Sequence, residues 1–445
     1  MTRDNIAAIA TAAGAAGVAV IRLSGDSPLK IAEKMFRPAG RTPVAEFEPY
    51  RMYPGEIAAE DFSDFGLCVY FRAPRSFTGE DVVEFHTHGG QKIAQGVLNK
   101  AVSLGARPAG PGEFTRRAFI NGKLSLASAE GLIDMINSRS SAEVRAGYSL
   151  YRERLTGLVS AMQDGLSAAL AQIDADMDFP EEGLEETSRA AVKETLAVTL
   201  KEVRALLGTF KAGSRVKNGV KVGIVGKPNT GKSSLLNALL QYDKAIVSDC
   251  PGTTRDVVEG SLEIRGVRFY ISDTAGIRDS ADRIESMGVE LSKRVLKESD
   301  VLLFVIDGAD VTEEDKAVQK LISGMNVITV VNKTDKGGVS FAGADLYVSA
   351  LTGENVECVK EALFARTVGA GTDTSGDFLC EERHYAALLR AEESLNAALE
   401  TVRSFPLDIA ETDIREAWSA LGEITGKTAS EEIIEQIFSR FCVGK

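Results

Sequence analysis

Residues 222–234 combine the residue types that bind a nucleoside triphosphate. Residues 226–233 read Gly-Lys-Pro-Asn-Thr-Gly-Lys-Ser, which fits the phosphate-loop pattern of Gly, four residues and Gly-Lys-Ser. The glycines let successive backbone N–H groups face phosphate oxygens, and the N-terminus of the following helix adds partial positive charge. Lys232 can neutralise the outer phosphates, and the Ser233 hydroxyl can hold Mg²⁺. A chance glycine turn is disfavoured, because a strand is predicted before the loop and an apolar helix after it.

Three later motifs follow predicted strands and complete a guanine-nucleotide site. Residues 273–276 can reach Mg²⁺ and the outermost phosphate. Within residues 332–335, the Asp335 carboxylate can accept from two donors on the same edge of guanine, a pair that adenine lacks. Residues 349–350 resemble the last base-contacting loop of GTPases. The residues expected to contact GTP are Asn229, Thr230, Gly231, Lys232, Ser233, Ser234, Asp273, Thr274, Ala275, Gly276, Asn332, Lys333, Asp335, Ser349 and Ala350.

Composition restricts the class of protein. The 445 residues suggest about three domains, and 44% hydrophobic with 26% charged residues is ordinary for a globular chain. A net charge of −13 argues against a general nucleic-acid coat protein, so any RNA contact should be local or shared with a partner. The five cysteines are scattered without a Cys-x-x-Cys, which favours the reducing cytoplasm over a disulfide framework or a zinc finger. No apolar run is long enough to span a bilayer, and the alanine-rich residues 6–21 favour a strand at 18–23 over a secretion signal.

Periodicity divides the chain into four ranges. Residues 1–118 alternate short strands (18–23, 66–71 and 81–86) with short helices (28–35 and 91–104), an α+β pattern. Residues 119–213 are helical, with a first helical stretch over 139–177 and a second helix over about 187–210. Residues 214–370 alternate strands (222–225, 268–272, 301–306 and 326–331) and helices, which predicts a largely parallel sheet. Residues 371–445 are helical again, and their last helix is expected over about 430–441. We therefore expect a discontinuous helical domain into which a P-loop GTPase domain is inserted.

Several longer motifs identify a family. They are residues 77–81 (Phe-Thr-Gly-Glu-Asp), 88–90 (His-Gly-Gly), 111–119 (Pro-Gly-Glu-Phe-Thr-Arg-Arg-Ala-Phe) and 441–445 (Phe-Cys-Val-Gly-Lys). Together they resemble the bacterial tRNA-modification GTPases of the MnmE (TrmE) family, over essentially the whole chain. The resemblance implies an N-terminal folate-binding domain that forms a homodimer, a helical domain and a potassium-dependent GTPase domain.

The resemblance also implies a reaction. The family works with the flavoprotein MnmG and installs a carboxymethylaminomethyl or aminomethyl group at carbon five of the tRNA wobble uridine. Its one-carbon unit comes from a reduced folate, 5,10-methylene-tetrahydrofolate, and a 5-formyl analogue could occupy the same site. One departure concerns residues 12–17, which read Ala-Ala-Gly-Ala-Ala-Gly where the family has a Pro-Pro-Gly-Arg-Gly-Gly-like turn.

Site residues follow from the matched motifs. Thr254 would complete the Mg²⁺ shell with Ser233, and Asn229, Ser248, Cys250 and Thr253 would bind K⁺. Glu285 would position the attacking water, because Ile277 stands where many GTPases have glutamine; Arg278, Asp279, Asp282 and a monovalent cation are the alternatives. The implied switch residues are Ser248, Asp249, Cys250, Gly252, Thr253 and Thr254, the folate-contacting residues are Arg22, Glu84, Lys123 and Lys445, and the catalytic residues are Glu285, Lys232 and Cys442.

Some interpretations stay open. We expect the last four residues to dock beside the folate site, with Cys442 acting as a nucleophile or lining the pocket. His86 and His88 could be a metal pair, but packing or hydrogen bonding is favoured because no third ligand is evident. Arg116, Arg117, Arg152 and Arg154 could equally contact RNA phosphates or be solvated. A ribosome-assembly switch could use the same GTPase motifs, although such proteins usually carry a basic appendage that this acidic chain lacks.

Overall fold

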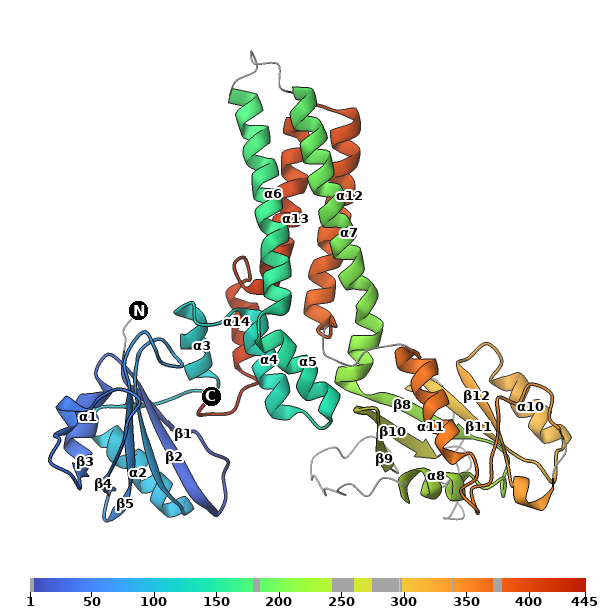
Figure 1. Ribbon diagram of the computed structural model, residues 1–445, viewed down its shortest axis with the longest axis horizontal. Coiled ribbons are helices and arrows are strands. Elements are labelled where there is room, and N and C mark those ends of the chain that lie inside the picture. Colours follow the sequence, from blue (N-terminus) through green and yellow to red (C-terminus); the bar gives the residue numbers. More distant parts are fainter. Residues whose placement is uncertain are drawn as a thin grey trace. The chain divides into compact units, whose positions relative to one another are not determined.

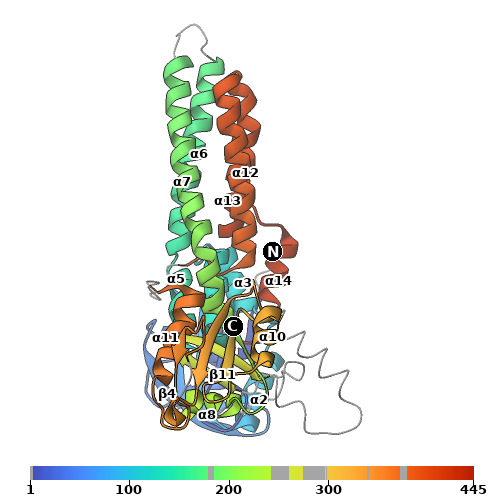
Figure 2. The same ribbon diagram turned by 90° about the vertical axis from the view of Figure 1, so that its right-hand side faces the viewer.

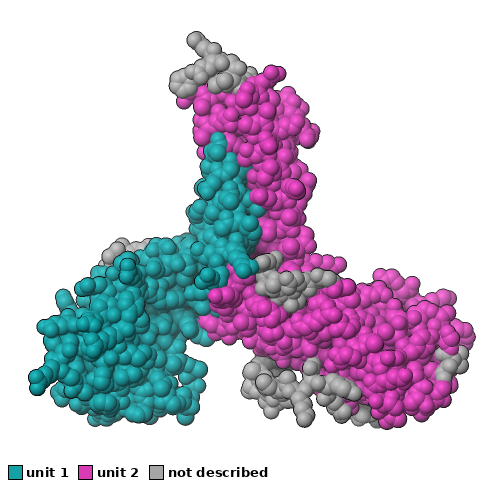
Figure 3. Space-filling view, viewed as in Figure 1, with its two compact units in different colours: residues 1–133, 150–168, 418–445 teal, residues 134–149, 169–417 magenta. Residues whose placement is uncertain are grey.

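A computed structural model describes residues 4–178, 185–241, 260–273, 296, 298–337, 340–370 and 378–445. The chain forms two compact units (Figure 3). The first contains residues 1–133, 150–168 and 418–445, and the second contains residues 134–149 and 169–417. These units do not follow the four ranges expected from the sequence, so the domain boundaries stay a prediction.

The first unit contains a seven-stranded sheet with the order β3-β4-β5-β6-β2-β1-β7. Its strands are β1 (Ile6–Ile9), β2 (Ala16–Gly25), β3 (Phe36–Pro38), β4 (Met52–Ala58), β5 (Ser63–Phe71), β6 (Asp81–Gly89) and β7 (Arg107–Pro108). All neighbours are antiparallel except β1 and β7, which are parallel. The predicted strands at 18–23, 66–71 and 81–86 are confirmed within β2, β5 and β6. The alanine-rich run forms β1 and most of β2, paired antiparallel with Ile9 opposite Ile21.

Helices α1 (Pro28–Met35) and α2 (Gln91–Ser103) cover one face of this sheet (Figure 1). Their buried residues, including Met35 and Val97, pack with Ile21, Leu23 and Phe85 in one hydrophobic cluster. Side chains alternate between the faces of a strand, so the intervening residues of β2 and β6 lie on the opposite face.

The other helical segments of the first unit bring the end of the chain close to its N-terminal part. Helix α3 (Glu113–Ile120) is followed by α4 (Leu126–Asn137), and α14 (Glu431–Phe438) begins at Ser430, whose hydroxyl accepts a hydrogen bond from the Ile433 N–H. Leu126, Ile437, Phe438 and Phe441 share one hydrophobic cluster. The C-terminal helix, expected to reach residue 441, therefore ends at Phe438 while Phe441 remains buried.

The second unit contains a six-stranded sheet with the order β13-β12-β11-β8-β10-β9. Its strands are β8 (Val220–Val225), β9 (Gly260–Ile264), β10 (Val267–Asp273), β11 (Val301–Asp307), β12 (Val327–Asn332) and β13 (Leu346–Tyr347). Neighbours are parallel except for the β9–β10 hairpin, so the predicted parallel sheet is confirmed. In β11, Leu303 and Val305 join one hydrophobic cluster while Phe304 and Ile306 join another, because a strand buried on both faces is apolar throughout.

Three helices follow strands of this sheet along the chain: α8 (Lys232–Gln241), α10 (Glu313–Leu321) and α11 (Val356–Phe364). Two long helices, α7 (Glu185–Asn218) and α12 (Glu382–Ser404), run side by side (Figures 1 and 2). Helix α7 extends beyond the predicted residue 210 and ends at Gly219, whose φ of 75° is the left-handed conformation that terminates helices. The remaining helical elements are α5 (Ser141–Tyr151), α6 (Arg154–Asp178), α13 (Ala410–Thr425) and the short turns η1 (Val44–Glu46), η3 (Thr334–Lys336), η4 (Ala365–Gly369) and η5 (Leu407–Ile409).

The predicted helical stretch over 139–177 is divided into α5 and α6. Glu153 stands between them with a φ of 62°, a conformation that a helix cannot contain. Its carboxylate accepts hydrogen bonds from the Ser125 N–H at 3.2 Å and the Ser128 hydroxyl at 3.3 Å. These contacts come from a distant segment, so the periodicity of the stretch alone could not indicate the break.

Three ionisable side chains of the second unit meet near the points where the chain enters its sheet from α7 and leaves it toward α12. Lys217 Nζ lies 2.8 Å from Asp134 Oδ1 and also contacts the Glu381 carboxylate. Burial, together with the neighbouring charge of Glu381, raises the pKa of Asp134 to about 7. No helix in the described part of the chain is both long and apolar enough to cross a membrane.

Candidate functional site

The phosphate loop connects β8 to α8 in a conformation that requires its glycines. Gly226 has a φ of 152°, and a Cβ there would lie 2.3 Å from the Val305 carbonyl oxygen. Gly231 has a φ of 88°, and a Cβ there would lie 2.3 Å from Asn332 Nδ2. Lys232 donates to the carbonyl oxygens of Gly226 at 3.0 Å and Lys227 at 2.8 Å. The loop therefore curls around the ammonium group that the sequence assigns to the outer phosphates.

The base-recognition motif holds the phosphate loop from the β12 side. Asn332 Nδ2 donates to the Thr230 carbonyl oxygen, and its Oδ1 accepts from the Ala350 N–H, both at 3.0 Å. Lys333 Nζ donates to the Asn229 carbonyl oxygen at 2.7 Å. Asn332 is 1% exposed, so its side chain acts as a buried link between three loops that the sequence places far apart.

Asp335 is oriented by the last of the predicted loops. The Ser349 hydroxyl donates to Asp335 Oδ1 at 2.6 Å, and Ser349 Oγ accepts from the Thr352 N–H at 3.2 Å. Ser349 is fully buried whereas Asp335 is exposed. The carboxylate is thus fixed at the surface, where a base can approach it.

Sequence reasoning missed two contributors to this site. Asp307, at the end of β11, accepts from Lys333 Nζ at 2.6 Å. Burial alone would raise its pKa, but the hydrogen bonds from Lys333 and the Ala309 N–H, together with the charges of Lys333 and Lys336, outweigh burial and lower the pKa. The signal was a carboxylate directly after an apolar parallel strand, the same signal that had identified Asp273.

The second missed contributor is Lys227 of the phosphate loop. Its Nζ lies 3.2 Å from Asp310 Oδ2, Thr312 Oγ1 and Asp315 Oδ2. Asp315 is fully buried and forms the capping box of α10 with Thr312. The capping-box spacing of 312–315 is readable in the sequence, but nothing in the sequence indicates its pairing with Lys227.

The other predicted nucleotide contacts are only partly described. Ser233 and Ser234 are exposed on the first turn of α8. Asp273 is the last residue of β10, but the structure describes only its backbone. The predicted residues Ser248, Asp249, Cys250, Gly252, Thr253, Thr254, Thr274, Ala275, Gly276 and Glu285 lie outside the described residues.

A second polar site lies on the sheet of the first unit. Arg22 of β2 and Glu84 of β6 form an ion pair with 2.7 Å between Nε and Oε1, and His86 Nε2 lies 3.2 Å from Glu84 Oε2. The Arg22 guanidinium lies 5.6 Å from the Phe77 ring and 5.8 Å from the Phe114 ring. Burial would raise the pKa of Glu84, but the hydrogen bonds and charges of His86 and Arg22 together outweigh it and lower the pKa.

The last four residues lie beside this site. Pro111 and Val443 form an antiparallel bridge, and the Phe114 N–H donates to the Lys445 carbonyl oxygen at 3.2 Å. Lys123 Nζ donates to the Pro74 carbonyl oxygen at 3.0 Å, on the segment that leads to Phe77. Cys442 is exposed. The structure thus brings the tail, Phe114 and Arg22 together, with Lys123 at the neighbouring loop.

Four of the residues with open interpretations have partners. His86 contacts Glu84, and His88 Nδ1 lies 2.7 Å from Asp64 Oδ1. Among the described residues, no group of three or more His, Cys, Asp or Glu side chains could hold a metal ion. Arg116 pairs with Glu431, and the side chain of Arg117 is only 12% exposed within a network of carboxylates. Neither arginine is therefore a simple solvated position on a helix.

Comparisons with known proteins agree with this arrangement. A model of the MnmE helical domain matches residues 126–442, and a model of the GTP-binding protein TrmE N-terminus matches residues 5–123. The tRNA modification GTPases MnmE of Shouchella clausii (strain KSM-K16) and Symbiobacterium thermophilum are 37% and 39% identical to this chain, and each alignment covers 100% of both proteins. The MnmE of Caldicellulosiruptor saccharolyticus is 36% identical with the same coverage. The chain therefore belongs to the MnmE family of tRNA modification GTPases.

Proposed function

We propose that this chain is a potassium-dependent GTPase that acts with the flavoprotein MnmG on the tRNA wobble uridine. The products would carry a carboxymethylaminomethyl or aminomethyl group at carbon five, with the one-carbon unit taken from 5,10-methylene-tetrahydrofolate. The observation that supports the GTPase part best is a set of contacts in which Asn332 and Lys333 hold the phosphate loop. In the same motif, Asp335 is oriented by Ser349.

Guanine selection follows from the geometry of Asp335. A carboxylate offers two acceptor oxygens to the imino and amino groups of guanine. Ser349 orients Asp335 through Oδ1, so the carboxylate does not have to be ordered when the base binds. Adenine would leave these acceptors without matching donors, a mismatch that disfavours ATP.

Phosphate binding would use the loop that encloses Lys232. Its ammonium group now contacts two loop carbonyl oxygens, and triphosphate oxygens would replace them as more strongly charged acceptors. Ser233 is exposed on the first turn of α8, so its hydroxyl fits one position in a Mg²⁺ shell that Thr254 would complete. Mg²⁺ would supply positive charge to the β- and γ-phosphate oxygens.

Hydrolysis needs a water-positioning group other than Ile277, whose side chain cannot donate or accept a hydrogen bond. We assign that role to Glu285. Asn229 is exposed in the phosphate loop at a φ of 66°, so its side-chain oxygen fits one position in a K⁺ shell with Ser248, Cys250 and Thr253. K⁺ would add the positive charge that an arginine finger provides in other GTPases.

The tRNA-modifying part of the proposal rests on the first unit. Arg22, Glu84, Lys123 and Lys445 would contact the reduced folate, and the Phe77 and Phe114 rings offer aromatic surface beside Arg22. Cys442 is exposed at the tail and would lie close to the one-carbon unit. A homodimer in the cytoplasm, with domains at 1–118, 119–213, 214–370 and 371–445, completes the proposal.

The first test is the rate of GTP hydrolysis by the purified chain in potassium and in sodium at equal ionic strength. We expect hydrolysis of GTP but not ATP, and a much faster rate in potassium. Asn229→Ala should lose the potassium stimulation and still bind GTP. Equal rates in the two salts would remove the potassium role, and an absence of GTP binding would contradict the whole proposal.

A further inference from the structure

The start of α3 is shaped to receive another segment of the chain. Gly112 precedes the helix with a φ of 63°, and a Cβ there would lie 2.5 Å from the Phe438 carbonyl oxygen. Glycine is therefore required for two reasons: the left-handed backbone and the close approach of the end of α14.

The tail occupies this surface through backbone contacts. The Gly112 N–H donates to the Cys442 carbonyl oxygen at 3.4 Å, and the Phe114 N–H donates to the Lys445 carbonyl oxygen at 3.2 Å. Gly444 has a φ of 102°, and a Cβ there would lie 2.3 Å from the Ile9 carbonyl oxygen at the end of β1. The tail thus fits closely against both α3 and β1.

Glu113 stands between the two N–H groups that bind the tail. Its carboxylate accepts two hydrogen bonds from Arg107, at 3.0 and 2.6 Å, and one from Arg117 at 3.1 Å. It also accepts from the Gly110 N–H at 2.8 Å. A bidentate contact with arginine fixes both distance and orientation, so Glu113 determines how the first turn of α3 is held.

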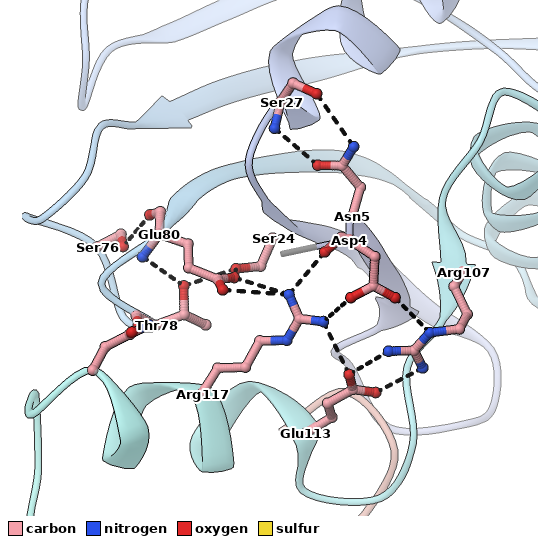
Figure 4. A network of polar contacts seen from close by, with 11 residues as sticks. Asp4, Asn5, Ser24, Ser27, Ser76, Thr78, Glu80, Arg107, Glu113 and Arg117 are labelled. Carbon is pink, nitrogen blue, oxygen red and sulfur yellow. Dashed lines mark hydrogen bonds and ion pairs between the residues drawn. The ribbon is translucent and has the colours of Figure 1, made fainter. Parts of the chain in front are cut away.

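Two more carboxylates extend this network across the first unit (Figure 4). Asp4 lies 2.7 Å from Arg107 Nε and 2.6 Å from Arg117 Nη2, and Glu80 lies 3.1 Å from Arg117 Nη1. Glu80 also accepts from the Ser24 hydroxyl at 2.7 Å. Burial would raise the pKa of Glu113, but the hydrogen bonds from Arg107, Gly110 and Arg117, together with the charge of Arg107, outweigh it and lower the pKa. Glu113 is consequently ionised at neutral pH.

The same turn of α3 reaches the Arg22 site. Phe114 is fully buried with Ile6 and Ala8 of β1, and Ala8 is the β-sheet partner of Arg22. Its ring lies 5.8 Å from the Arg22 guanidinium. Residues 112–114 therefore contact the tail, the ionic network and Arg22, the side chain assigned to folate binding.

We infer that Glu113 is a positioning residue: its clamp to Arg107 and Arg117 holds the first turn of α3 so that the tail presents Cys442 and Lys445 beside Arg22. Glu113 itself touches no reactant in this account. The effect on modification rests on the proposed function, whereas the effect on the tail does not.

The test is hydrogen exchange of the full-length chain, followed by mass spectrometry in the absence of nucleotide, folate and tRNA. Glu113→Gln keeps the shape and removes the charge, so exchange in peptides covering 110–116 and 440–445 should rise about tenfold, as expected for losing one charged hydrogen bond. Arg107→Met should reproduce the change, and Arg107→Lys should reproduce part of it, because lysine keeps the charge but cannot form the bidentate contact. Glu56→Gln is the matched control, because its partner Arg37 lies 3.9 Å away in an exposed pair on the same sheet.

A second readout separates positioning from general stability. Glu113→Gln should lower the turnover of wobble-uridine modification at saturating folate, weaken folate binding because Lys445 is less well placed, and leave GTP hydrolysis unchanged. Unchanged exchange in both Glu113→Gln and Arg107→Met would overturn the inference. So would an equal rise throughout β1, β2 and β6, which would show that the network only stabilises the sheet. If exchange in the tail of Glu113→Gln rises as expected but the wild-type chain modifies no uridine, the proposed function is wrong. The role of Glu113 in positioning the tail is then retained.

Discussion

The nucleotide site and the tail site are built in opposite ways. The nucleotide site gathers loops that follow β8, β12 and β13 of one largely parallel sheet, and each loop carries a short contiguous motif. The tail site joins the start of α3 to residues 442–445, at the other end of the chain. Parallel strands place their carboxyl ends at one edge, so strand order alone gathers the first site, whereas only tertiary packing gathers the second.

The two sites should therefore fail separately. Deleting residues 442–445 should abolish wobble-uridine modification, because Cys442 and Lys445 are lost, and leave GTP hydrolysis largely intact. A nucleoside profile of tRNA and a GTPase assay on the same variant measure both effects. Cys442→Ser distinguishes the two interpretations of this thiol. Loss of modification indicates that the thiol takes part in the chemistry, and normal modification indicates that it only packs. Normal modification in the truncated chain would show that the tail has no role.

Asp335→Asn should affect only the nucleotide site. GTP affinity should fall by about 1–3 kcal/mol, the cost of leaving a buried polar pair mismatched, when measured by titration. Xanthosine triphosphate should recover much of the loss, because xanthine carries a carbonyl where guanine carries an amino group. Glu357→Gln, an exposed change on α11, is the control, and an unaltered GTP affinity in Asp335→Asn would refute the assignment.

Lys227→Met tests whether the nucleotide site also depends on a contact outside the motifs. Losing the anchor to Asp310, Thr312 and Asp315 should raise the KM for GTP about fivefold, equivalent to about 1 kcal/mol, with kcat unchanged. Lys227→Arg should behave like the wild type. Asp315→Asn should give a similar shift, and the double variant should add little to either single one. A fall in kcat at constant KM would indicate partial unfolding instead.

The two units should also respond to pH with opposite signs. Glu84 and Glu113 have lowered pKa values, so their stabilisation is present at neutral pH and is lost as the pH falls through the folded-state pKa. Asp134, with a pKa of about 7, binds its proton more tightly in the folded state. Raising the pH through 7 therefore favours unfolding around Asp134.

Hydrogen exchange at pH 6 and pH 8, corrected for intrinsic rates, measures this difference. Protection near α4, α7 and α12 should fall by about 1 kcal/mol at pH 8, while the first unit should change little. Asp134→Asn should remove the dependence. Glu392→Gln, whose partner Arg204 also joins α12 to α7, should retain it. If the exchange protection around Asp134 in the wild type does not depend on pH, the raised pKa of Asp134 is contradicted.

The sequence predicted what local pattern and strand order determine. The phosphate loop, the Asn332–Asp335 motif and Ser349 were found because each follows an apolar strand. The α+β and parallel sheets were found because their strand periodicity differs from that of helices. Asp307 and Lys227 were missed because their importance lies in partners, Lys333 and Asp315, which no spacing rule links to them.

Long-range packing accounts for the remaining differences. The break at Glu153 depends on Ser125 and Ser128, and the early end of α14 accompanies the tail's turn toward Pro111. The resemblance to MnmE proteins indicated that the 111–119 motif and the tail were important. It did not reveal that they contact each other, nor that Glu113 joins them to Arg107 and Arg117.

The central claim is that GTP hydrolysis by this chain serves modification of the wobble uridine. The most direct measurement is a mass-spectrometric nucleoside profile of tRNA from a strain that lacks its MnmE protein, complemented by this chain or by its Asp335→Asn variant. The account predicts that the wild-type chain restores the carbon-five carboxymethylaminomethyl or aminomethyl nucleoside and that the variant restores much less. Restoration of no modified wobble uridine by an expressed, folded wild-type chain that hydrolyses GTP would contradict it.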